Sequence, residues 1–105
     1  MITIEQLRSL SKFENIAITD HARIRLNERN ISIEDIISCI NTGEIIANYP
    51  DDKPLESYLI LGVSVKGKYI HIVVSSDADF IYLITAYFPD PEVWESDFKK
   101  RKKVL

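Results

Sequence analysis

The stretch Tyr69-Ile70-His71-Ile72-Val73-Val74-Ser75 decides the fold of this chain. Apolar β-branched residues alternate in it with more polar ones, and this period of two predicts a β-strand. The two isoleucines and Val74 would point into a core. The opposite face of the strand, with His71 near its centre, is mixed in polarity, and we expect it to be only half covered.

Three more segments around this stretch are predicted strands, because they are rich in β-branched and aromatic residues and are bounded by turn residues. They are residues 44–49, 57–65 and 80–88. Lys66-Gly67 predicts a tight two-residue hairpin, in which residue 65 pairs with residue 68. That register would put Gly62 opposite His71. Residues 44–90 are therefore predicted to form an antiparallel sheet of about four strands.

The first 43 residues have helical patterns, and each predicted helix begins at a residue that can cap it. The expected boundaries are Thr3 with Gln6 for the first helix, Thr19 or Asp20 to Asn30 for the second, and Ser32 to Gly43 for the third. Helices followed by an antiparallel meander indicate an α+β fold with the helices packed on one sheet face. We expect one domain over residues 1–105, with a helical half (1–43), a sheet (44–90), and a C-terminal helical turn with a basic tail (91–105).

Composition is typical of a soluble protein, with 46% hydrophobic and 28% charged residues among 105. The single Cys39 lies in an apolar helical pattern and is expected to be a small buried residue rather than a nucleophile. We see no signal sequence or membrane span, so a cytoplasmic protein without membrane partners is expected. Net charge is −3, but residues 99–103 are all basic. This run is either a solvated end or a tail that binds phosphate or a partner.

The segment 19–29 carries the first group of candidate functional residues. His21, Arg25 and Arg29 recur every four residues and would lie along one edge of a helix, beside the inward face of Ala22 and Leu26. An imidazole titrates near neutral pH and guanidiniums bind phosphate in a forked geometry, so this edge suits phosphate chemistry. The alternative is a solvent-exposed face, in which Arg25 pairs with Glu28 and Arg29 with another acid.

The strands carry the second group. With Gly62 opposite, His71 would have open space beside it, as a substrate site needs; alternatively, Gly62 marks a bulge and His71 bonds a neighbour. Tyr87 and Thr85 share one face of the last strand. A regular register would separate Tyr87 from His71, whereas a one-residue bulge would bring it to the same face. No motif typical of metal binding or of a phosphate-binding loop occurs, so neither a metal nor a cofactor is expected.

Several short motifs, taken in order, resemble those of a bacterial family known only as domain of unknown function 4258. The resemblance spans residues 20–100. It is carried by His21-Ala22 with Arg25 and Arg29, Gly43 to Ile46, Tyr49 to Pro54, Tyr58 to Gly62, Ile70 to Val74, Ile84 to Tyr87, Pro89-Asp90-Pro91 and Trp94.

This family is similar to a distant branch of the RelE-like and barnase-like ribonuclease fold. The resemblance implies metal-independent cleavage of RNA, the toxin role in a toxin–antitoxin pair, and a small zinc-finger antitoxin as the partner. His21, Arg25, Arg29, His71 and Tyr87 occupy the matching motif positions. For such a cleavage we expect His21 and His71 to be the catalytic acid–base pair, in unassigned order, and Tyr87 to be an orienting donor or the alternative acid. Arg25, Arg29 and Thr85 are the expected substrate-binding residues. The alternative is a non-catalytic module of the same fold that binds protein or RNA. The net acidity favours this alternative, since RelE-like toxins are usually basic.

Overall fold

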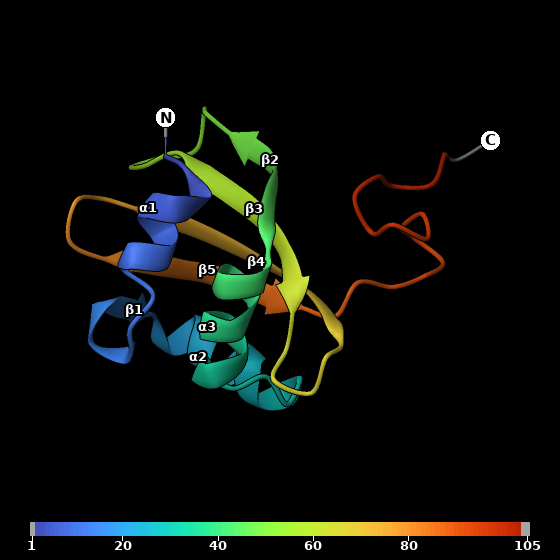
Figure 1. Ribbon diagram of the computed structural model, residues 1–105, viewed down its shortest axis with the longest axis horizontal. Helices are drawn as coiled ribbons and strands as arrows, with labels where there is room; N and C mark the ends of the chain where they lie inside the picture. The colour runs from blue at the N-terminus through green and yellow to red at the C-terminus, as the bar shows by residue number, and fades with distance from the viewer. Residues whose placement is uncertain (1, 104–105) are drawn as a thin grey trace.

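The computed structural model describes residues 2–103 as a five-stranded sheet with helices on one face (Figure 1). Met1 and residues 104–105, the ends of the predicted domain, lie outside the described residues. The helices are α1 (Ile4–Ser9), α2 (Asp20–Glu28) and α3 (Ile33–Thr42), and a short 3-10 helix, η1 (Phe13–Asn15), follows α1. The strands are β1 (Ile16–Ile18), β2 (Glu44–Tyr49), β3 (Ser57–Val63), β4 (Tyr69–Ser76) and β5 (Ile81–Tyr87). The predicted α+β class is confirmed.

The sheet has one strand more than the four that the sequence predicts. The additional strand is β1, which pairs in parallel with the first half of β5, so that the strand order is β1-β5-β4-β3-β2. Three residues are too few for a period of two to be recognised in a sequence. Because β1 ends at Ile18, helix α2 rather than a strand lies beside the second half of β5.

The predicted helix starts are confirmed by their caps. The Thr3 hydroxyl accepts a hydrogen bond from the Gln6 amide, and the Gln6 side chain accepts one from Thr3 in return. Ser32 and Asp35 repeat this capping box at α3, and Thr19 caps α2. These bonds satisfy amide groups that a helix N-terminus otherwise leaves without partners.

The core lies between α3 and the inner face of the sheet. Ile60, Ile70 and Ile72 are fully buried there, together with Ile36 and Ile40 of α3. The carbon that a side chain would add at Gly62 would lie 2.3 Å from the Cys39 carbonyl oxygen. Gly62 therefore allows the backbone of α3 to approach the sheet closely.

The hairpin between β3 and β4 differs from the predicted one. It has a three-residue loop, Val65 to Gly67, closed by a 2.8 Å hydrogen bond from the Ser64 amide to the Lys68 carbonyl, and Gly67 has a φ of 82°. A glycine in the left-handed region is what such a loop requires. The additional residue shifts the register by one, so Gly62 pairs with Ile70, and His71 pairs with Leu61. The prediction that Gly62 leaves space beside His71 is wrong, because a shift of one residue turns Gly62 to the other face.

A bulge between β4 and β5 has the opposite consequence. The pairs Val73↔Thr85 and Val74↔Leu83 leave Ile84 as an additional residue in β5. Beyond it, His71 pairs directly with Tyr87. Of the two alternatives that the sequence left open, the structure has the bulge, which brings Tyr87 to the face of His71.

Residues 89–103, which we call the C-terminal strap, follow β5 and extend away from α1 (Figure 1). No helix is formed over residues 92–98; a single turn overlaps their start, closed by a 2.9 Å hydrogen bond from the Trp94 amide to the Asp90 carbonyl. The strap consists of turns closed by backbone bonds such as Glu95 to Lys100 and Lys102 to Val93, each 2.8 Å. Two of the four prolines, Pro89 and Pro91, lie in the strap.

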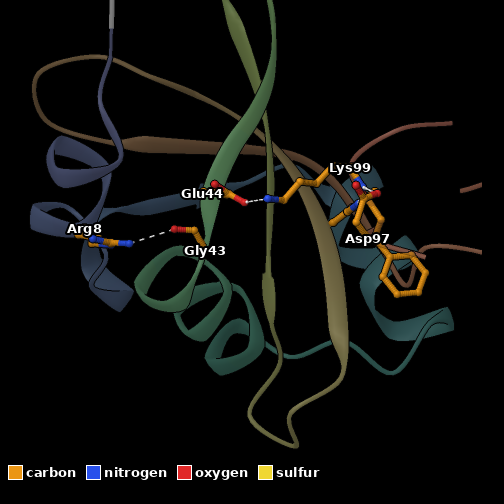
Figure 2. A network of polar contacts seen from close by, with 7 residues as sticks. Arg8, Gly43, Glu44, Asp97 and Lys99 are labelled. Carbon is orange, nitrogen blue, oxygen red and sulfur yellow. Dashed lines mark hydrogen bonds and ion pairs between the residues drawn. The ribbon is translucent and has the colours of Figure 1, made fainter. Parts of the chain in front are cut away.

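Both ends of the described chain are connected to the junction of α3 with β2. Arg8 of α1 donates a 2.9 Å hydrogen bond to the Gly43 carbonyl, and Lys99 of the strap forms a 2.6 Å ion pair with Glu44 (Figure 2). Figure 2 shows the two side chains reaching these neighbouring residues from opposite sides. The pair of Lys99 and Glu44 is about half exposed, so it positions the strap more than it stabilises the fold.

Candidate active site on the far face of the sheet

His71 lies on the face of the sheet away from α3, which we call the far face, and it is fully buried. Its Nδ1 lies 3.2 Å from the Tyr87 hydroxyl, and its Nε2 lies 2.7 Å from the Phe98 carbonyl oxygen. The Trp94 ring stands edge-on to the imidazole at 4.4 Å between centroids. The strap thus covers His71, and the expectation of a half-covered face does not hold at this residue.

These two contacts determine where the imidazole carries its hydrogen. A carbonyl oxygen only accepts hydrogen bonds, so Nε2 carries a hydrogen and donates it to Phe98. Burial lowers the pKa of His71, and the Phe98 bond opposes this only in part. The neutral ring therefore has its lone pair on Nδ1, which accepts the hydroxyl hydrogen of Tyr87. The arrangement is that of a neutral imidazole that accepts a hydrogen bond from a phenol.

Tyr87 is the partly exposed member of this pair. Its hydroxyl bonds the buried imidazole, and part of its side chain reaches the surface. Burial raises the pKa of Tyr87, and the nearby Tyr49 adds to the increase, whereas the cationic Arg101 and Arg29 oppose it. The phenol is thus a neutral donor at pH 7, with positive charge close enough to stabilise an anion beside it.

Arg29 and Thr85 are brought together at the edge of the sheet. Arg29 caps the C-terminus of α2, and its Nη1 donates to the Ala86 carbonyl at 2.7 Å and to the Thr85 hydroxyl at 3.3 Å. Both residues precede Tyr87 directly in β5. A guanidinium has five N–H donors, so Arg29 keeps donors for a phosphate after making these bonds.

His21 and Arg25 lie on the same helix but are exposed. His21 is in the first turn of α2, eight residues before Arg29, which is about 12 Å along a helix axis. The alternative ion pairs of Arg25 with Glu28, and of Arg29 with an acid, are absent from residues 2–103, where Lys99–Glu44 is the one ion pair. The four residues that the structure joins by hydrogen bonds are thus His71 with Tyr87 and Arg29 with Thr85.

Sequence reasoning missed the residues of the strap that complete the site. Phe98 supplies its carbonyl, Trp94 packs on the imidazole, and Arg101 lies over the Trp94 ring at 5.7 Å. Nothing in the sequence indicated that Trp94 and Phe98 would contact His71. The basic run of residues 99–103 is partly packed, through Lys99 and Arg101, rather than wholly solvated.

Other candidate chemistry is less well supported. Cys39 is buried as predicted, and burial raises the pKa of its thiol to about 12, which keeps it protonated and inert. Within residues 2–103, no three His, Cys, Asp or Glu side chains gather as the ligands of a metal ion would. In that same part of the chain, none of the helices has the length and apolar character to span a membrane.

Comparison with known proteins gives one match. No curated protein and no solved structure matches the chain. A family model described as "Domain of unknown function (DUF4258)" matches residues 18–88, which include α2 and β2 to β5 and end just before the strap. All six candidate site residues fall inside the matched range, whereas the strap residues that cover His71 fall outside it. The chain belongs to the DUF4258 family.

Proposed function

We propose that this protein is an endoribonuclease that needs no metal ion, and that His71 and Tyr87 form its acid–base pair. RNA carries its own nucleophile, the 2′-hydroxyl, so the protein has only to move protons and stabilise the phosphate. The observation that carries the proposal is the Tyr87 hydroxyl, which bonds a neutral imidazole whose other nitrogen is held by Phe98. General acid–base catalysis of this kind contributes about 10²–10⁴-fold to a rate.

The proton transfers follow from this geometry. As the 2′-oxygen attacks phosphorus, its proton passes to the Tyr87 oxygen, and the phenolic proton passes to Nδ1 of His71. The resulting imidazolium stays bonded to the Phe98 carbonyl through Nε2. The bond from phosphorus to the 5′-oxygen breaks, and that oxygen takes a proton from a water molecule, since exposed His21 lies about 12 Å along α2 from Arg29.

Positive charge is required where the phosphate becomes more negative. Arg29 is held beside Tyr87 by Ala86 and Thr85, and in the proposal its remaining N–H groups bind the phosphate oxygens. Thr85 would orient Arg29 and the substrate together. Exposed Arg25, one turn before Arg29 on α2, would bind a neighbouring phosphate of the RNA strand.

The test is RNA cleavage by the purified chain in the presence of EDTA. We expect cleavage to persist in EDTA and to fall at least about 100-fold in Tyr87→Phe, which removes only the hydroxyl. Tyr69→Phe is the matched control, since Tyr69 precedes His71 by two residues and packs its ring on Phe98 instead. Loss of activity in EDTA, or full activity in Tyr87→Phe, would overturn the proposal.

We also propose that the cleavage serves as the toxin activity of a toxin–antitoxin pair, with a small zinc-finger protein as the antitoxin. The family resemblance of the motifs around His21 and His71 supports this role. Expression of the wild-type chain should stop bacterial growth, and expression of Tyr87→Phe at the same level should not. Normal growth with an RNA-cleaving wild-type protein would reject the toxin role alone.

A non-catalytic binding module is the second candidate. The observation in its favour is that His71 is fully buried with both nitrogens bonded, as expected for a structural residue. In this case the strap, with Arg101 over Trp94, would form the binding surface for a protein partner. The RNA cleavage test separates the two candidates, because only the first predicts any difference between Tyr87→Phe and Tyr69→Phe.

A further inference from the structure

A cavity of about 560 Å³ lies on the far face of the sheet, at the end opposite to the strap. Its walls include Pro54 and Leu55 from the loop before β3, and Ile84 from β5. Ser57, Ser75 and Tyr82 also line it. The volume is within the range of pockets that bind small organic groups, about 300–1,000 Å³.

The serine hydroxyls of this cavity have hydrogen-bonding capacity left over. Ser57 and Ser75 are 1% and 7% exposed, and their oxygens lie 3.3 Å apart. Two hydroxyls supply two hydrogens, of which the bond between them uses one. The second hydrogen has no acceptor among the contacts of residues 2–103. A ligand atom in the cavity that accepts this hydrogen would gain a hydrogen bond.

The lining also includes one acidic and one basic residue, Asp52 and Lys53, from the loop before β3. Pro54, Leu55 and Ile84 offer apolar surfaces that suit a flat ring. The Tyr82 hydroxyl is occupied by the carboxylate of Asp77, so Tyr82 contributes its ring to the wall rather than a free donor. Apolar walls and a polar floor match the shape of a nucleobase, which has two apolar faces and a polar edge.

The bulge in β5 connects this cavity with the candidate active site. Ile84 is the additional residue of the bulge and is 46% exposed. It lies three residues from Tyr87, about 10 Å along a strand, with Thr85 and its partner Arg29 between them. One RNA strand can thus follow β5, with a phosphate at Arg29 and a base at Ile84.

We infer that this cavity binds one unpaired base of the RNA, which makes single-stranded RNA the substrate class. The inference rests on the proposed function. A base enters the cavity only when it is unstacked and unpaired, so a duplex is excluded. The loop before β3 and the serine pair then form a specificity site, distinct from the His71–Tyr87 pair that moves protons.

Binding can be measured separately from cleavage with 2′-O-methyl trinucleotides of A, C, G and U, which lack the nucleophile. We expect at least one of them to bind, and its Kd to increase at least about 10-fold in Ile84→Trp, which fills the cavity. Ser75→Ala should increase Kd about 5-fold through the loss of one neutral hydrogen bond. The Kd of the same trinucleotide annealed to its complement within a longer duplex should be at least about 10-fold higher.

Matched controls keep the test interpretable. Phe13→Trp changes an apolar residue that is 71% exposed and far along the chain from the cavity. Ser11→Ala changes a buried serine whose hydroxyl has no partner. Both should bind like wild type. Failure of all four trinucleotides to bind, or wild-type binding in both cavity variants, would overturn the inference.

The two proposals fail in different ways. Binding that Ile84→Trp weakens, without any RNA cleavage by wild type, would support the cavity and reject the ribonuclease. Cleavage that Tyr87→Phe abolishes, with cavity variants that bind and cleave every sequence like wild type, would support the ribonuclease and reject the cavity.

Discussion

The two faces of the sheet are both largely buried, but they are buried by different means. On the inner face, apolar side chains such as Ile60 and Ile72 pack against α3, and Gly62 lets the two backbones approach closely. On the far face, the polar His71 is covered by an irregular strap and has a hydrogen bond at each nitrogen. The inner face is held by apolar packing, whereas the far face holds His71 in place through hydrogen bonds to Tyr87 and Phe98.

The largest predicted loss of stability comes from a substitution on the inner face. Gly62→Ala would place a carbon against the Cys39 carbonyl, and backbone atoms cannot move aside as a side chain can. We expect the free energy of unfolding to fall by about 3 kcal/mol. Gly67→Ala, where nothing lies within 4 Å, should cost only about 1 kcal/mol through its positive φ. Urea denaturation measures both, and equal losses would contradict close packing at Gly62.

A smaller effect is predicted where the strap covers the far face. Trp94→Ala removes the ring that packs on His71, and we expect a loss of about 2 kcal/mol. Burial lowers the pKa of His71, so opening the site should raise that pKa toward its ordinary value of 6.5. Titration by NMR checks this, with Val93→Ala, its exposed neighbour, as the control. An unchanged His71 pKa in Trp94→Ala would show that the strap does not control the site.

The stability of the protein should depend on Arg29, which bonds the edge of the sheet, and not on Arg25. Arg29→Ala loses the bonds to Ala86 and Thr85, and about 1.5 kcal/mol is expected for a charged donor. Arg25→Ala, on the same helix and exposed, should change stability by less than about 0.5 kcal/mol. Thermal denaturation of the two variants compares them. Similar losses of stability in the two variants would mean that the Arg29 hydrogen bonds do not form in solution.

The smallest effect is a pH dependence of stability. The folded protein has a lowered pKa at His71, so the unfolded chain binds a proton more readily. The stability from the neutral imidazole is complete above pH 6.5 and is lost as pH falls from there through the lowered folded pKa. The decrease should be absent in His71→Gln and present in His21→Ala, as measured by unfolding at pH 7.5 and 5.5. If the decrease in stability were absent in His21→Ala and present in His71→Gln, its assignment to His71 would be rejected.

Local signals in the sequence were sufficient for most of the fold. Helix caps such as Thr3 and Ser32 act within four residues, and strand alternation acts within a single segment, so both were predicted correctly. The strand β1 was missed because three residues carry no period. The hairpin register was wrong by one because a three-residue loop uses the same glycine, Gly67, that a two-residue turn would use.

The candidate site depended on contacts that no local pattern contains. The bulge at Ile84 decides whether Tyr87 lies on the same face as His71. The sequence was compatible with a regular register and with a bulge, and it did not decide between them. The carbonyl of Phe98 belongs to the backbone, and every residue has one, so its bond to His71 could not be predicted from the sequence. His21 and Arg25 looked equivalent to Arg29 by spacing, but among the hydrogen bonds of residues 2–103 it is Arg29 that bonds β5.

The central claim is that Tyr87 and His71 on the far face move the proton of an RNA 2′-hydroxyl. The most direct measurement is cleavage in EDTA of one RNA oligonucleotide, compared with the same oligonucleotide carrying a single 2′-deoxy nucleotide at the cleaved position. The wild-type protein should cleave only the first, and Tyr87→Phe should cleave neither at a comparable rate. Cleavage of the deoxy-substituted strand by the wild type, or equal rates for wild type and Tyr87→Phe, would contradict the claim.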